Sequence, residues 1–322
     1  MRVLLTGAAG FVGRALTRVL TSRGHAVRAL DRTDSPDLAA MGAEVVTGDA
    51  TDPATLCAAV AGRDVLIHLA GIRRSTDPAE FMRINADGTR VALEACLSAA
   101  PHLSRFVLAG SRAAIAPSPA PLDETVPFGP VEPYGASKAE AERIALSYAG
   151  RLPVSVARPP RIMGPGDREN LLFFRIARRG LALGFSGPPR PLSWIDVDDC
   201  ALGFALLAER PEAVGEVFFL AAPEPTTAQG LMLEAARALG VRARRLTVPA
   251  PLLRAAARAA DAISDATGRR LPLNRKLVAQ VLAPGWQCNP AKARQRLGFV
   301  AGTSLSQSID RATSWYRAQG WL

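Results

Sequence analysis

Cysteine and histidine are scarce in this sequence. The four cysteines, Cys57, Cys96, Cys200 and Cys288, lie far apart and include no C-x-x-C pair, and the three histidines lack the spacing of metal ligands. We therefore expect neither a disulfide framework nor a metal site. A chain without disulfides fits a reducing compartment, so the protein is expected to be cytoplasmic.

Long apolar runs are missing as well. No stretch reaches the ~18 residues of a membrane-spanning helix, and glycines occupy the N-terminal positions where a signal peptide has its apolar core. The sequence therefore predicts neither a membrane span nor secretion. The 322 residues, 48% hydrophobic and 21% charged, have a globular composition and can bury a large core without disulfides or metal.

Lysine is rare, although the formal net charge is +10. Only Lys138, Lys276 and Lys292 are lysines among the 39 basic residues, and the arginines are scattered singly or in pairs among acidic residues. A nucleic-acid surface would gather its charge in a basic stripe with interleaved aromatic residues, and none is seen. The expected partner is therefore a small-molecule substrate and not a nucleic acid.

Short apolar segments alternate with helical segments through the first half of the chain. Helical spacing of apolar residues is found over 11–23, 79–99 and 134–149. Strands that alternate with helices are parallel and covered on both faces, so the sequence predicts an α/β fold with a doubly wound sheet. The predicted strands are 2–6, 26–31, 44–47, 65–69, 105–109 and 154–158.

The composition of the sequence changes after residue 159, where proline and glycine become frequent and most of the predicted elements are helices. One later segment is expected to return to the sheet, with strands at 193–197 and 216–220. The rest is expected to form a smaller, mostly helical substrate-binding domain over the carboxyl edge of the sheet. The predicted domains are thus 1–160 together with 193–222, and 161–192 together with 223–322.

Three glycines stand between the first predicted strand and the first predicted helix. Gly7, Gly10 and Gly13 would allow a tight turn, the approach of the backbone to a pyrophosphate, and close packing of helix on strand. The helix that begins with Phe11 and Val12 would present N–H groups and its positive dipole end to the phosphates. The motif predicts a Rossmann-type dinucleotide site, and the alternative is a plain strand–helix turn.

Two neighbouring residues give opposite indications about the cofactor. Asp31, at the end of the second predicted strand, would bind the ribose hydroxyls and repel a 2′-phosphate, which favours NAD. Arg32 could bind that phosphate instead, so NAD is expected and NADP stays open. Asp49, followed by Ala50, stands where an acid could accept a hydrogen bond from adenine, or could simply form a turn.

A tyrosine and a lysine share one face of a predicted helix. Tyr134 and Lys138 are four residues apart, so the ammonium would lie near the phenol and lower its pKa. Ser111 follows a predicted strand and could bind a substrate oxygen at the edge of the sheet. The plainer alternatives are a surface pair on the helix and a cap at the strand end.

These motifs together resemble the extended short-chain dehydrogenases/reductases, often called the NAD-dependent epimerase/dehydratase family. The resemblance rests on TGAAGFVG at 6–13, HLAG at 68–71, YGASK at 134–138, RPPRIMGPGD from residue 158 and IDVDD at 195–199. It runs through nearly the whole chain. The order and spacing of the motifs make it specific.

The resemblance implies roles for individual residues. Tyr134 would be the general acid/base, Ser111 would hold the substrate oxygen, and Lys138 would bind the nicotinamide ribose and tune Tyr134. The sequence departs from the family at Gly110, where a second hydroxyl residue often stands. The residues expected around the cofactor are Gly7, Gly10, Phe11, Val12, Gly13, Asp31, Arg32, Asp49, Ala50, Leu69, Ala70, Gly71, Tyr134, Lys138 and Pro159.

The activity that the resemblance implies is hydride transfer between NAD(P) and a secondary alcohol or its ketone. One alternative is a nucleotide-sugar epimerase or dehydratase, which returns the hydride to the same substrate. Another is a non-catalytic, cofactor-binding subunit, although the presence of Ser111, Tyr134 and Lys138 argues against it.

The substrate class is indicated by departures from the sugar-nucleotide pattern. Enzymes that act on nucleotide sugars often carry Asn three residues after Arg158 and Arg shortly before V-D-D, where this chain has Arg161 and Leu192. Arg190 could replace the second, and we expect both Arg161 and Arg190 to face the substrate. The flanking segments look closer to the 3β-hydroxysteroid dehydrogenase and dihydroflavonol reductase branch, which implies a hydrophobic substrate. An apolar helical face over 251–263 could line such a cleft or belong to the core.

Assembly is the last expectation. The predicted helices 87–99 and 136–149 carry small apolar residues at helical spacing, and in the family the equivalent helices often pair as a four-helix bundle. We therefore expect a homodimer. The alternative is that these faces pack on the chain's own sheet.

Overall fold

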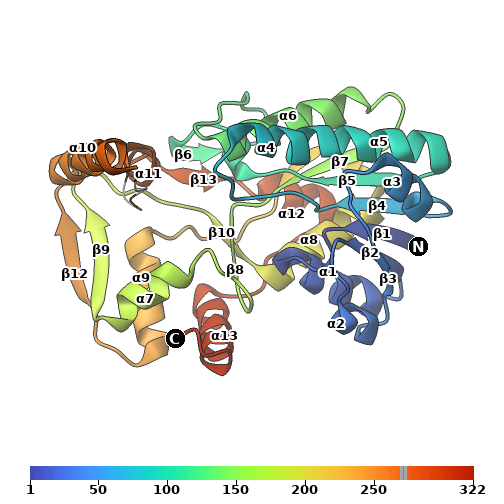
Figure 1. The fold of residues 1–322 in the computed structure, drawn as a ribbon. Helices are drawn as coiled ribbons and strands as arrows, with labels where there is room; N and C mark the ends of the chain where they lie inside the picture. Colours follow the sequence, from blue (N-terminus) through green and yellow to red (C-terminus); the bar gives the residue numbers. More distant parts are fainter. Residues whose placement is uncertain (269–270, 272–273) are drawn as a thin grey trace.

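The centre of the molecule is a seven-stranded parallel sheet (Figure 1). The computed structural model describes residues 1–268, 271 and 274–322. The strand order is β11-β7-β5-β4-β1-β2-β3, and Val3 of β1 lies opposite Val27 of β2. The predicted doubly wound α/β fold of Rossmann type is confirmed. The strands are β1 Arg2–Thr6, β2 Ala26–Asp31, β3 Glu44–Thr47, β4 Val65–His68, β5 Arg105–Ala109, β7 Val154–Arg158 and β11 Val217–Phe219.

Helices cover both faces of this sheet (Figure 1). Successive strand residues point to opposite faces, so Leu4 is buried in the layer formed by α3, α5 and α6, while Val3 and Leu5 are buried in the layer formed by α1 and α8. A π-helical segment, Met82–Asp87, joins α4 to α5. The helices of this part are α1 Phe11–Ser22, α2 Pro36–Ala40, α3 Pro53–Val60, α4 Pro78–Phe81, α5 Gly88–Ala99, α6 Pro133–Ser147, α8 Val197–Glu209 and α12 Ala291–Leu297.

A smaller unit stands beyond the carboxyl edge of the sheet (Figure 1). Its core is formed by Phe174, Leu231 and Tyr316, from three different helices. Three pairs of short strands complete it: β8 with β10, β9 with β12, and β6 with β13. The bounds are β6 Ser118–Leu122, β8 Arg161–Met163, α7 Leu171–Arg178, β9 Leu181–Phe185, β10 Trp194–Asp196, α9 Ala228–Leu239, β12 Arg244–Val248, α10 Ala250–Thr267, α11 Arg275–Val281, β13 Trp286–Cys288 and α13 Leu305–Ala318.

The segment expected to return to the sheet does so only in part. The predicted strand at 193–197 exists as β10, but it pairs with β8 outside the seven-stranded sheet. Pro159 and Pro160 lie between β7 and β8; because proline has no N–H to donate, the sheet ladder stops there. The later strand of the segment, β11, pairs with β7 at the sheet edge as expected. The division into two domains with the boundaries given above stays a prediction.

The apolar helix at 251–263 forms most of α10, and its apolar residues do not line the cleft described below. Leu252 and Ile263 are 62% and 51% exposed, while Ala257 and Ala260 face the chain. The helix that does line the cleft is α11, through Leu277 among others. In the part of the chain that the structure describes, no helix is both long and apolar enough to cross a membrane.

The helix faces expected to form a dimer are mostly used within the chain. Ala92 and Cys96 of α5 and Ala141 and Ala145 of α6 are fully buried in the layer that covers the sheet. The observation on which the dimer was predicted is therefore explained by packing inside one chain, and the homodimer stays a prediction.

Candidate active site

The glycine loop has the shape that its sequence predicts. Gly7 has a φ of +69°, and a Cβ there would lie 2.8 Å from the backbone nitrogen of Ala70. A Cβ at Gly13 would overlap the carbonyl oxygen of Gly7, so α1 packs closely on the loop. Gly10 precedes α1, and no side chain caps the helix. This combination of a close backbone approach and an uncapped helix N-terminus fits a pyrophosphate group.

Asp31 ties the glycine loop to the end of β2. Its Oδ2 accepts a hydrogen bond from the Ala9 N–H at 2.9 Å, and its Oδ1 accepts one from the Arg32 N–H at 2.8 Å. Each carboxylate oxygen can accept a second bond, so Asp31 remains suited to ribose hydroxyls. Arg32 is exposed beside it, and both residues lie where the sequence places the adenosine end of the cofactor.

Asp49 forms a turn after β3. Its Oδ1 accepts bonds from the N–H and the hydroxyl of Thr51, both at 2.8 Å, and these bonds lower the pKa of the carboxyl group. Ala50 is buried beside it. The turn-forming alternative thus describes the observed contacts, and an adenine contact stays a prediction.

A narrow pocket of about 160 Å³ lies where β4, β5 and β7 end. A Cβ at Gly71 would come within 2.7 Å of Asn85 Oδ1, so only glycine leaves this wall open. Ala70, behind the wall, donates its N–H to the Thr6 hydroxyl at 3.2 Å. Residues from motifs that are distant in the sequence line this pocket together, and the pocket fits the ribose of the nicotinamide. The pocket gathers Val12, Leu69, Gly71, Tyr134, Lys138 and Pro159 from the predicted site.

The predicted catalytic residues come together at the mouth of this pocket. Tyr134 and Lys138 lie one turn apart on α6, and the Ser111 side chain lies close enough to Tyr134 to influence its pKa. The Lys138 ammonium donates to the carbonyl oxygen of Ala109 at 2.8 Å. Ser111 also caps the 3₁₀ turn that follows it, through a 3.1 Å bond from the Ala113 N–H. Its strand-end role and its contact with Tyr134 are therefore both present.

The pKa of Tyr134 differs from the sequence-based expectation. Burial raises it, while the Arg73 guanidinium and the Ser111 side chain oppose the rise. The net shift is upward, whereas the Tyr–Lys spacing led us to expect a lowered value. Burial also lowers the pKa of Lys138 to about 8, because the low-dielectric surroundings disfavour its charge.

A buried ion pair below the site was missed in the sequence. Glu142, one turn beyond Lys138, contacts Arg158 Nε at 2.7 Å, and the two side chains are 0% and 3% exposed. Glu142 Oε1 also accepts the Ser111 N–H at 3.2 Å. A Cβ at Gly110 would overlap this oxygen, which explains why a glycine stands where the family often has a hydroxyl residue.

A second residue that sequence reasoning missed is Arg73. Its guanidinium carbon lies 4.3 Å from the centre of the Tyr134 ring, and its Nη2 is 3.6 Å from Glu132 Oε1. Arg73 lies on the loop after β4, two residues beyond Gly71, where nothing in the sequence pattern marks it. It lines both the narrow pocket and the larger cleft.

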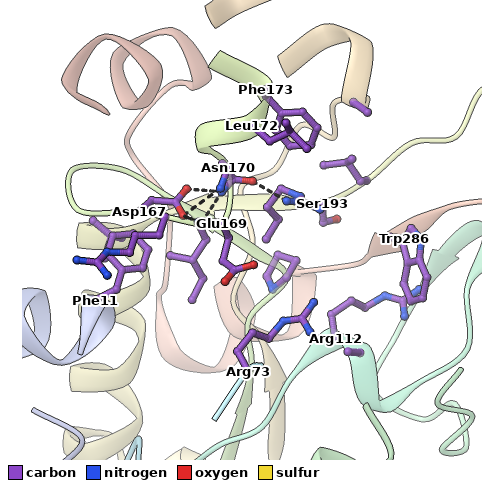
Figure 2. Close-up of a pocket in the computed structure, with 18 of the residues that line it drawn as sticks. Phe11, Arg73, Arg112, Asp167, Glu169, Asn170, Leu172, Phe173, Ser193 and Trp286 are labelled. Atoms are coloured by element: carbon purple, nitrogen blue, oxygen red, sulfur yellow. Dashed lines mark hydrogen bonds between the residues drawn. The ribbon is translucent and has the colours of Figure 1, made fainter. Parts of the chain in front are cut away.

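The larger cleft, of about 1720 Å³, has Tyr134 in its lining. Figure 2 shows part of this cleft. Leu172 and Phe173 of α7 form one apolar wall, and Trp286 of β13 contributes to another. Phe11, the first residue of α1, and the predicted substrate residue Arg161 also line it. Among the described residues, no group of histidine, cysteine, aspartate and glutamate side chains could hold a metal ion.

Arg190 lines the same cleft but has a structural task. It donates hydrogen bonds to the carbonyl oxygens of Phe185, Ser186 and Leu282, at 3.3, 3.0 and 3.3 Å. Most of its donors thus hold backbone segments together. The expectation that Arg190 replaces a phosphate-binding arginine gains no support from this geometry.

Comparison with known proteins assigns the family. The model of the NAD dependent epimerase/dehydratase family matches residues 3–221. The chain belongs to this family. The enzyme is an NAD(P)-dependent oxidoreductase of the extended short-chain dehydrogenase/reductase type, which confirms the resemblance read from its motifs.

Two relatives and one solved structure match the enzyme over nearly its whole length. A ceramide reductase of Caulobacter vibrioides is 31% identical, with 99% of this chain and 96% of that protein covered. A 2-alkyl-3-oxoalkanoate reductase of Stenotrophomonas maltophilia is 30% identical, with coverage of 97% and 98%. The crystal structure of gox2253 is 28% identical, with a TM-score of 0.85 and coverage of 99% and 98%.

Proposed function

We propose that the enzyme interconverts a secondary alcohol and a ketone on a hydrophobic small molecule. The observation that carries the proposal is the place of Tyr134, which lines both the narrow pocket and the apolar cleft and lies close enough to Ser111 for that side chain to lower its pKa. A group at this boundary can pass a proton to a substrate in the cleft while the nicotinamide ring lies in the pocket. Two relatives named as reductases support the same reading.

In this proposal the residues of α6 and β5 handle the proton. Because burial raises its pKa, Tyr134 is protonated at neutral pH and donates its proton to the carbonyl oxygen during reduction. Ser111 holds that oxygen beside the phenol, and in oxidation the proton moves the other way. When bound, the nicotinamide supplies or accepts the hydride. Lys138 would bind the nicotinamide ribose.

We propose NAD as the preferred cofactor. Asp31 places a carboxylate at the end of β2, where it would accept bonds from ribose hydroxyls and repel a 2′-phosphate. Arg32, exposed next to it, keeps NADP as the second candidate. The glycine loop, with Gly7, Gly10 and Gly13, would hold the pyrophosphate.

A substrate screen tests the proposal. The purified enzyme would be assayed with NADH and NADPH against hydroxysteroids, flavanonols, β-keto esters and UDP- or GDP-sugars, following the absorbance of the reduced nicotinamide. We expect turnover of apolar alcohols or ketones. Activity or binding confined to nucleotide sugars would overturn it, and cofactor binding without any turnover would point to a non-catalytic subunit.

We also propose that the enzyme is a cytoplasmic homodimer. The assembly rests on the resemblance to a family whose equivalent helices often pair as a four-helix bundle, and the compartment rests on the four free cysteines. Light scattering at micromolar concentration tests the assembly, and a monomer mass would contradict it.

A further inference from the structure

Three arginines face the part of the cleft next to Tyr134. The guanidinium of Arg73 covers the Tyr134 ring at 4.3 Å. Arg161, on β8, has a pKa lowered by burial; the charge of Asp167 opposes this shift, and the charge of Arg73 adds to it to a smaller degree. Arg112 directly follows Ser111, is 3% exposed, and has a buried Nη2 without a hydrogen-bond partner among the described residues. The site therefore has an excess of positive charge close to the reacting oxygen.

No described carboxylate forms a hydrogen bond with these arginines. Glu132 forms an ion pair with Arg73, with 3.6 Å between Oε1 and Nη2, but this distance is too long for a hydrogen bond. Arg161 donates to the neutral amide oxygen of Asn170 at 2.5 Å. Arg112 donates to backbone carbonyl oxygens. The guanidinium groups of Arg73 and Arg161 thus keep donors for a ligand.

The other acidic residues of this wall are already engaged. Glu169 forms an ion pair with Arg74 at 2.8 Å. Asp167 Oδ1 accepts the backbone N–H groups of Glu169 and Asn170 at 2.7 and 3.2 Å (Figure 2). Both carboxylates attract the charge of Arg161, but neither forms a hydrogen bond with it, so its remaining N–H groups stay open to a ligand.

We propose that Arg73 and Arg161 bind a carboxylate that the substrate carries beside its reacting ketone. A planar guanidinium offers parallel N–H groups that match the two oxygens of a carboxylate. A carboxylate held by Arg73 lies next to the Tyr134 phenol, so it must be only a few bonds from the carbonyl group. This inference rests on the proposed function and names the substrate class for the same site.

The apolar wall of the cleft indicates the rest of the molecule. Leu172 is 61% and Leu277 is 41% exposed, and both line the cleft together with Phe173. Large apolar side chains left open in a cleft favour an apolar ligand. The substrate class is therefore an oxo acid with an apolar chain, whose ketone and carboxylate lie a few bonds apart, as they do in a 3-oxo acid. In its reduction a hydride adds to the ketone carbon and the Tyr134 proton to the oxygen, and the carboxylate is unchanged.

The test compares a 3-oxo acid with its own methyl ester. Wild-type enzyme should reduce the freshly prepared acid at least ~10-fold more efficiently in kcat/KM than the ester. Arg161→Gln and Arg73→Gln should each lower this acid-to-ester ratio by about 10- to 100-fold. Arg175→Gln is the matched control, because Arg175 is an exposed arginine of α7 outside the cleft, and it should keep the ratio.

The outcomes separate the inference from the function on which it rests. A wild-type enzyme that reduces the ester as well as the acid, or a ratio unchanged in both cleft variants, overturns the carboxylate site. Binding of UDP-sugars that is lost in both variants would assign the arginines to a diphosphate and overturn it too. If no ketone of any kind is reduced, the proposed function itself fails. Thermal melting of each variant confirms that it is folded.

Discussion

The carboxyl edge of the sheet and the cleft beyond it are assembled in different ways. At the edge, Ser111 stands two residues beyond β5 and Gly71 three residues beyond β4, each within a short continuous motif. In the cleft, Arg112 lies over Trp286, and Arg161 lies over Phe173, so its walls come from segments that are distant in the sequence or belong to separate elements.

The difference follows from the geometry of parallel sheets. The carboxyl ends of neighbouring strands meet at one edge, so residues placed after them converge whatever the rest of the chain does. The walls of the cleft converge only through tertiary packing. Substitutions at the edge should therefore change turnover or binding with every substrate and cofactor. Substitutions in the cleft should change activity with some substrates and leave it unchanged with others.

The largest effect is expected at the buried pair below the edge. Glu142→Gln leaves the Arg158 charge buried without its partner, which should lower the free energy of unfolding by about 3–5 kcal/mol. Denaturant unfolding measures this loss. Glu140→Gln on the same helix is the control, because its pair with Arg143 is partly exposed and should change stability by less than ~1 kcal/mol. If the two variants lose the same free energy of unfolding, the buried pair below the edge contributes no more to stability than an exposed pair on the helix surface.

The next largest effect is expected on turnover. Tyr134→Phe keeps the ring but removes the proton donor, so kcat should fall by about 10²-fold or more with every substrate, while NADH affinity changes little. Tyr148→Phe is the control, since that hydroxyl contacts Glu94 at the far end of α6. Steady-state kinetics and cofactor titration give both quantities. A near-normal rate in Tyr134→Phe would take this residue out of the mechanism.

A smaller effect is expected on cofactor choice. Asp31→Ala removes the carboxylate that opposes a 2′-phosphate and should narrow the preference for NADH over NADPH by about 10-fold. Because Asp31 also accepts the Ala9 N–H, both dissociation constants should rise somewhat, and their ratio is the informative quantity. Asp34→Ala, exposed in the same loop, should leave the ratio unchanged. A wild-type preference for NADPH would show that Arg32 dominates.

The smallest expected effect is a dependence of cofactor binding on pH. With a pKa of about 8, Lys138 is cationic below that pH and loses its charge as the pH rises through it. NADH affinity should therefore fall a few-fold between about pH 7 and about pH 9. Lys138→Arg, which stays charged, should show a flatter profile, and Lys292→Arg, paired with Glu216 outside the site, should keep the wild-type profile. A flat wild-type profile contradicts this role of Lys138.

Much of the edge could be predicted from the sequence because its signals are local. Glycine spacing, the Tyr–Lys pair and the apolar strands each depend on a few neighbouring residues, and six predicted strands match the observed ones within one residue. Gly7 needs its positive φ in the turn itself, which a sequence pattern can capture.

The remaining features depend on contacts between distant segments. Glu142 reads as a solvated helix residue, and only the departure at Gly110 hinted that something occupies the space beside it. Arg73 belongs to a loop without a motif. The pairing of β10 with β8 depends on the path that the chain takes after the two prolines that follow β7. Strand propensity predicts that a strand forms, but it does not predict which strand it pairs with.

The overlap between Gly110 and Glu142 also restricts how this site can change over evolutionary time. A serine or threonine introduced first at position 110 would collide with the Glu142 carboxylate. Replacing Glu142 first by a shorter residue would leave the buried charge of Arg158 without its partner. Either single substitution is therefore costly, and a residue with a Cβ at position 110 would also require the carbonyl oxygen of Ala157, 2.9 Å away, to shift. We therefore expect related chains to change positions 110 and 142 together or not at all.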